Sequence, residues 1–200
     1  MATSVLAAGL ALLGQSPTPA QERVPLHARI DQLVNQSSVG AMSLVAPDAD
    51  FLRRAYLDLT DRVPAAAEVR TFLADADPHK RRAVVERLLT SPQFDQRLAE
   101  WLDVSLMERR AEAQIPPAEW RKYLVDSVAA NKPYDQLARE ILSADGADPA
   151  LRPAVKFHLD RGGEPNLLTR DVGRMFFGVD LQCAQFHDHP LISDYFQYDY

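Results

Sequence analysis

The side chains best suited to chemistry lie close together near the end of the chain. Residues 183–190 read CAQFHDHP and contain the single cysteine and two of the five histidines of the 200-residue chain. On a helix, Cys183 and His187 would stand at positions i and i+4 and share one face. Thiolate and imidazole groups ligate metals and also attach and ligate haem. Because His189 precedes Pro190, helical backbone is disfavoured there, and we expect the helix to end near His187.

Three interpretations of this segment stay open from the residue types. Cys183 could be a buried thiol with no cofactor, a common role of unpaired cysteine. It could attach haem c through a single thioether with His187 as the axial ligand, because Phe186 stands where the usual C-x-x-C-H motif has its second cysteine. Cys183, His187 and His189 could also hold a metal ion such as zinc. A nucleophilic Cys183 is a weaker interpretation, since no oxyanion hole is visible.

Other candidate side chains sit in less specific patterns. We expect His158, in a stretch flanked by Pro and Gly, to be an exposed loop residue rather than a distal ligand. Met107 and Met175 lie in helical patterns, where packing is the usual role of methionine. Trp101 and Trp120 are expected to anchor the core.

A helix is predicted to position the cysteine. Apolar side chains recur at helical spacing over residues 168–183 and end on Cys183, so the pattern predicts one helix that brings this thiol to a buried face. The remaining pattern from residue 26 onward is also helical, and no stretch alternates as a strand would. Proline and capping signals divide it, among them Ser91 as an N-cap before Pro92. Residues 147–165 form the longest irregular stretch. We therefore predict an all-α domain of seven or eight short, irregularly packed helices.

Composition and the chain ends limit the classes of function. The net charge of −6 argues against a nucleic-acid partner. Residues 1–20 resemble a secretory signal peptide with cleavage after Ala20, and their apolar run is too short to span a bilayer. We therefore expect an exported protein of the periplasm or cell envelope, with a helical domain over residues 21–200. Because residues 191–200 carry four aromatics and no helix stop, we expect the domain to be incomplete at its C-terminal end.

Three blocks of sequence carry a family resemblance. Residues 51–75, 80–104 and 174–200, in that order, resemble the planctomycete-type cytochrome c-associated domain of unknown function. In larger members this domain lies between a cytochrome c-like domain and a second uncharacterised domain. The resemblance covers roughly residues 26–200 and implies an exported helical module, with other domains of a larger envelope protein or a cytochrome as partners. A link to haem or to polysaccharide degradation is implied by association only.

The sequence departs from the family pattern at two positions. Members typically read C-A-Q-C-H-D-H-P, so Phe186 removes the second thioether and leaves a degenerate motif. Asp61 stands where glycine is usual in L-D-L-T-G-R, a substitution that costs stability if the backbone there needs a positive φ. The leading functional hypothesis is a haem- or metal-associated accessory module built on Cys183 and His187. A cofactor-free interaction domain with a relic motif, or a module of a polysaccharide-degrading system, are the alternatives.

Overall fold

The described part of the chain is all helical, as predicted. The computed structural model describes residues 24–37, 44–110, 114–188, 190–193 and 196–200. No strand occurs within these ranges, and none of their helices is long and apolar enough to cross a membrane. The chain divides into two units, residues 1–45 and 46–200. The predicted signal peptide lies outside the described residues.

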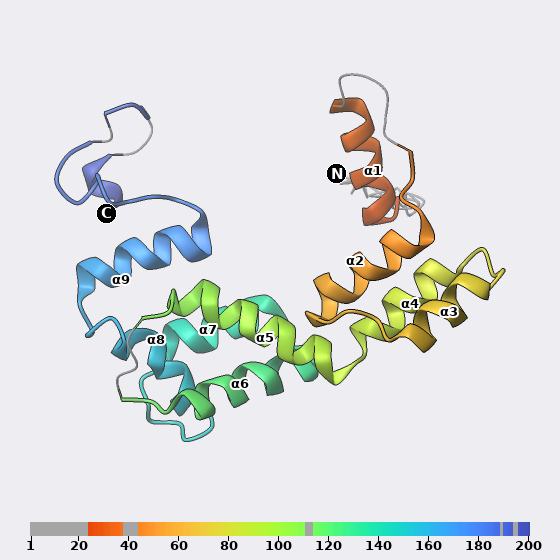
Figure 1. Cartoon of the computed structure of the whole chain (residues 1–200). Coiled ribbons are helices and arrows are strands. Elements are labelled where there is room, and N and C mark those ends of the chain that lie inside the picture. The colour runs from red at the N-terminus through yellow and green to blue at the C-terminus, as the bar shows by residue number, and fades with distance from the viewer. Residues whose placement is uncertain (1–23, 38–43, 111–113, 189, 194–195) are drawn as a thin grey trace, which may run out of the picture. The chain divides into compact units, whose positions relative to one another are not determined.

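The first unit contains one described helix, α1 (Leu26–Ser37) (Figure 1). Leu26, Ile30 and Leu33 recur along it at helical spacing, so the predicted period is correct. All three side chains are exposed, and no residue of α1 is buried. The apolar pattern therefore predicts the helix correctly, but the apolar face of α1 is not buried in a core.

The second unit begins with three helices around a small apolar core. These are α2 (Asp48–Thr60), α3 (Ala66–Ala74) and α4 (Lys80–Leu89). Leu52 and Tyr56 of α2 pack with Phe72 of α3 and Leu88 of α4. The start of α2 is joined to α4 by Asp48, whose carboxylate lies 2.7 Å from Lys80 Nζ and accepts a 2.8 Å hydrogen bond from Arg81 Nε.

The turn after α2 requires left-handed backbone. Asp61 has φ 56° and ψ 25°, and its N–H donates to the Leu57 carbonyl at 3.0 Å. This is a helix cap of the kind that usually takes glycine. The positive φ on which the predicted cost of Asp61 depends is therefore present, and glycine suits this position better than Asp.

A larger core is built by the next helices. They are α5 (Pro92–Met107), α6 (Pro117–Ala129), α7 (Tyr134–Ser143), α8 (Lys156–Leu159) and α9 (Pro165–Val172). α5 runs beside α6 (Figure 1), and Trp120, Leu124 and Phe157 are fully buried among them. α5 starts as predicted, because Ser91 Oγ accepts a hydrogen bond from Phe94 N–H at 3.3 Å. The predicted irregular stretch contains α8, which brings the α-helices of the described residues to nine instead of seven or eight.

The prediction that one helix delivers Cys183 to a buried face is wrong. α9 continues into a single π-helical segment, η2 (Gly173–Phe177), and ends at Gly178. Gly178 has φ 68°, and left-handed glycine at this position terminates helices. The chain then folds back, so a Cβ added to Gly173 would lie 2.9 Å from a methyl carbon of Leu181. Cys183 consequently lies in a turn and is half-buried.

Candidate functional site

The turn at residues 183–188 brings a thiol and an imidazole into one short segment. The Cys183 carbonyl accepts hydrogen bonds from the N–H groups of Phe186 and His187 at 3.1 and 3.2 Å. The His187 side chain is exposed, and its Nδ1 lies 2.6 Å from the Asp188 carbonyl oxygen. Because Nδ1 faces an acceptor, Nε2 is the nitrogen left for a metal. His189 lies outside the described residues.

These residues fit a haem or a metal only in part. Phe186 is 71% exposed at the position where C-x-x-C-H has its second cysteine, so a haem could be attached through Cys183 alone, and His187 is the histidine of the described part of this turn that could ligate it. No three His, Cys, Asp or Glu side chains of the described residues gather as a metal site would require. The donor set in view is therefore one thiol and one imidazole in an open turn.

The other candidate side chains named from the sequence either pack in or near the core or line a pocket away from Cys183. His158 is half-buried, and its Nε2 lies 3.1 Å from the Ile141 carbonyl oxygen, which corrects the expectation of an exposed loop histidine. Met107 is buried in the core, as predicted. Trp120 is also buried, with 1% of its surface exposed, but Trp101 is 57% exposed and does not anchor the core. Trp101 and Met175 both line a pocket.

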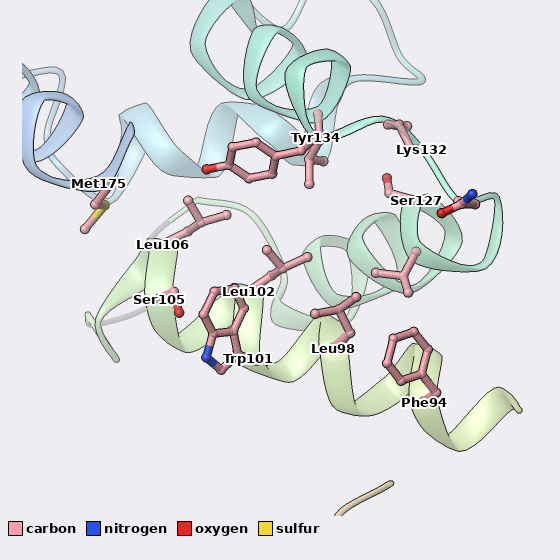
Figure 2. Close-up of a pocket in the computed structure, with 13 residues that line it drawn as sticks. Phe94, Leu98, Trp101, Leu102, Ser105, Leu106, Ser127, Lys132, Tyr134 and Met175 are labelled. Carbon is pink, nitrogen blue, oxygen red and sulfur yellow. The ribbon is translucent and has the colours of Figure 1, made fainter. Parts of the chain in front are cut away.

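These two residues lie on a pocket formed by the described residues. It has a volume of about 590 Å³ and lies between the outer face of α5, the end of α6, α7 and η2. Figure 2 shows Phe94 toward one end, Met175 at the other, and Tyr134 facing Leu102 and Trp101 across the pocket. The lining is mostly apolar and aromatic with a few polar groups, and its volume falls within the ~300–1,000 Å³ usual for small-molecule sites.

The α5 wall of the pocket explains why Trp101 is exposed. Leu98, Trp101 and Leu102 lie on the same stripe of α5: Leu102 is buried in the core, Leu98 packs half-buried against it, and Trp101 is exposed. The stripe is wider than the core that covers it. Its outer edge therefore becomes a pocket wall instead of an internal contact.

A cluster of charges lies at the Met175 end. The fully buried Arg161 donates through Nη2 to the Leu106 carbonyl at 2.8 Å and through Nε to Asp171 Oδ2 at 2.9 Å. Its Nη2 also lies 3.6 Å from Met175 Sδ. Since Leu106 and Met175 line the pocket, Arg161 forms the layer behind that end.

Further arginines surround the same carboxylate. Arg110 Nη2 donates to Asp171 Oδ2 at 2.7 Å, and Arg170 Nε donates to Oδ1 at 3.1 Å. Arg174 Nη2 lies 3.6 Å from Oδ1 and donates to Glu108 Oε1 at 2.5 Å. We call Glu108, Arg110, Arg161, Arg170, Asp171 and Arg174 the arginine cluster.

The two carboxylates of the arginine cluster are held in the charged form. Burial raises the pKa of Asp171, but hydrogen bonds from Arg161 and Arg170 outweigh it and keep that pKa below its ordinary value. Burial also raises the pKa of Glu108, and Arg174 and Arg110 again lower it to a net decrease. A glycosidase acid needs a raised pKa, so this pair does not provide one.

Sequence reasoning missed both the pocket and the arginine cluster. The stripe of α5 predicts an apolar face, but it cannot say which part of that face another helix covers. The arginines are scattered over residues 110–174, and only the return of α9 toward the end of α5 brings them together. One signal was available: Arg170 and Arg174 flank Asp171 at helical spacing.

Comparison with known proteins gives a family and no activity. Residues 25–200 match the family model PSCyt2, described as a protein of unknown function (DUF1549). No curated protein and no solved structure matches the chain. The match confirms the predicted resemblance to a family of unknown function, and its range is within one residue of the predicted 26–200. The association with cytochrome c stays a prediction.

Proposed function

We propose that this chain, which belongs to the PSCyt2 family of unknown function (DUF1549), is a helical module that binds an apolar small molecule in the pocket between α5 and α7. The observation that carries the proposal is the exposed indole of Trp101, 57% accessible on the wall of a pocket of about 590 Å³. Large aromatic side chains gathered in an open cavity commonly mark a binding site.

The surroundings of the pocket support binding of a ligand better than they support catalysis. Ser127 Oγ is already engaged with the Tyr123 carbonyl at 2.7 Å, and Lys132 Nζ lies 2.5 Å from Glu140 Oε2. Hydrogen bonding in this way occupies the polar groups that a reaction would need. Ser105, Asn131 and Tyr134 are the other polar residues of the lining, and the rest of it offers apolar contact, whose burial is worth about 25 cal/mol per Å².

The test is a fluorescence titration of the full chain with dodecanol, an uncharged apolar chain. Trp101 is exposed on the pocket wall and Trp120 is buried, so bound dodecanol should change the emission of Trp101 in a saturable way. Trp101→Phe should remove the signal, and calorimetry should still detect binding to that variant. A linear response without saturation, together with no heat of binding, would overturn the proposal.

A matched pair of variants locates the site. Leu98→Gln places a polar group on the pocket wall and should weaken dodecanol binding about tenfold. Leu73→Gln makes the same change at an exposed position of α3 outside this pocket and should leave the affinity unchanged. Equal effects of the two substitutions would place the binding elsewhere.

A second candidate function is haem attachment at Cys183 with His187 as the axial ligand. It is favoured by the 2.6 Å separation of His187 Nδ1 from the Asp188 carbonyl oxygen, which leaves Nε2 for iron. A haem there would supply one-electron transfer. The test is a pyridine haemochrome spectrum with metal analysis after coexpression with the cytochrome c maturation machinery. A single-thioether band lost in Cys183→Ser supports attachment; a colourless, metal-free protein that stays colourless in Phe186→Cys contradicts it.

We also propose that the protein is exported and works beside other domains of an envelope protein or a cytochrome. The support is the apolar run and Ala20 cleavage site of residues 1–20. Expression of the full chain in a bacterial host should yield a periplasmic product that begins at Gln21. An unprocessed cytoplasmic product would contradict export.

A further inference from the structure

The two ends of the pocket differ in charge. Lys132 lies well away from Met175 in the pocket (Figure 2), and its ammonium is matched by the single carboxylate of Glu140 at 2.5 Å. The opposite end, at Met175 and Leu106, adjoins the arginine cluster through Arg161. Only the second end therefore lies next to cationic groups that outnumber their carboxylates.

The excess of positive charge at that end is substantial. The arginine cluster contains four guanidinium groups and two carboxylates, a net charge of +2 in a chain whose net charge is −6. Arg110 Nε is buried without a hydrogen-bond partner among the described residues, so the donors of the cluster exceed its acceptors. Within the part of the chain that the structure describes, the cluster is thus short of anionic acceptors.

The outer arginines remain accessible. The side chains of Arg110, Arg170 and Arg174 are 24%, 34% and 46% exposed, while Arg161 and Asp171 are fully buried. The opposite charges of the buried Arg161 and Asp171 cancel. The net charge of +2 is therefore carried by the more accessible members of the arginine cluster. Arginine binds carboxylates through paired, charge-assisted hydrogen bonds.

We propose that the ligand of the pocket is an amphiphilic carboxylate, a single apolar chain whose head group extends past Met175, beyond the lining of the pocket, to Arg110 and Arg174. This proposal rests on the proposed function and specifies the ligand of the same pocket. The apolar chain lies along α5 toward Phe94, a helix length of about 18 Å from Leu106 at 1.5 Å per residue. The pocket supplies apolar contact, and the arginine cluster supplies the charge that is complementary to the carboxylate.

The test compares two probes that differ in the head group. Laurate and dodecanol are titrated into the full chain by calorimetry below the micelle concentration. Laurate should bind about tenfold more tightly or better, because charge-assisted hydrogen bonds are the stronger kind. Its advantage should shrink as ionic strength rises to about 0.15 M, where charges are screened over ~8 Å.

A matched set of variants assigns the head group to its arginines. Arg174→Gln should remove much of the advantage of laurate, and the further change Arg110→Gln should bring laurate to the affinity of dodecanol, while the affinity of dodecanol stays unchanged in both. Arg82→Gln removes the same charge from an exposed pair on α4 and should preserve the advantage of laurate. If Arg174→Gln unfolds, the salt dependence in the natural sequence decides in its place.

The outcomes separate this proposal from the function on which it rests. Saturable binding of dodecanol with no advantage for laurate overturns the amphiphilic carboxylate and keeps the apolar pocket. No binding of either probe overturns both. A laurate advantage that survives Arg174→Gln and Arg110→Gln places the carboxylate away from the arginine cluster and overturns the proposal. Binding only to vesicles that contain fatty acid would show a membrane surface as the ligand and also overturn it.

Discussion

Two regions of the molecule carry side chains capable of binding, and they are built in opposite ways. Residues 183–188 place Cys183 and His187 four positions apart in a turn, with the imidazole exposed. The walls of the pocket between α5 and α7 belong to helices that share one hydrophobic core. Trp120 and Phe157 are fully buried in that core. The potential ligands Cys183 and His187, which stand out in the sequence, thus lie in an open turn. The apolar stripe of α5, which suggests only packing in the sequence, lines a preformed cavity.

The difference shows that the spacing of residues in the sequence does not reveal whether their side chains are held in place for a ligand. A ligand gains affinity from groups that are already held in place, because it then spends less free energy on ordering them. The pocket meets this condition through buried neighbours. The turn at Cys183 is held by local backbone hydrogen bonds such as His187 N–H to the Cys183 carbonyl.

The largest expected contrast comes from truncating one phenylalanine in each region. Phe157→Ala empties a fully buried position behind the pocket and should lower the free energy of unfolding by about 3–5 kcal/mol. Phe186→Ala removes a ring that is 71% exposed in the turn and should change it by less than about 0.5 kcal/mol. Urea unfolding followed by circular dichroism measures both. Similar losses would show that the turn is packed as firmly as the core.

The buried carboxylate provides the next test. Asp171→Asn leaves the fully buried guanidinium of Arg161 without its counterion and should cost about 3 kcal/mol. Asp135→Asn breaks an exposed pair with Arg139 on α7 and should cost less than about 0.5 kcal/mol. Thermal unfolding of the two variants measures the contrast. Little loss in Asp171→Asn would mean that α9 does not depend on the arginine cluster.

The same carboxylate predicts a pH dependence. Because its pKa is lower in the folded chain, its contribution is present above its ordinary pKa and is lost as pH falls from about 5 through the folded value. The stability gap between the natural sequence and Asp171→Asn should therefore narrow as pH falls toward about 2. Melting temperatures at several pH values test this, and a gap that widens in acid would contradict the assigned charge state.

The smallest expected effect lies at the turn after α2, away from both regions. Asp61→Gly should stabilise the chain by about 0.5–1 kcal/mol, because glycine adopts positive φ without the steric cost of a side chain. Asp61→Ala should destabilise it, since alanine lacks the polar side chain that makes Asp tolerant of this conformation. Chemical denaturation distinguishes the two. Destabilisation by glycine would mean that the Asp61 side chain makes a compensating contact.

Local signals in the sequence predicted much of this architecture. Periodicity predicted the all-α class, and capping chemistry predicted the start of α5 at Ser91 and Pro92. Backbone preference predicted that Asp61 costs stability if its φ is positive, and its φ is positive. The end of the last long helix was missed, because the apolar spacing continues across Gly178, which terminates it. The pocket could not be predicted for a different reason. It exists because Trp101 is left exposed, and that exposure depends on which part of α5 another helix covers.

The most direct test of the central claim is a crystal structure of the full chain with laurate brominated at its terminal carbon. The bromine can be located by its anomalous scattering. We predict a bromine peak beside Phe94 and the carboxylate within hydrogen-bond distance of Arg174. A bromine peak at residues 183–200, or a pocket without the ligand at saturating concentration, would contradict the assignment of the binding site.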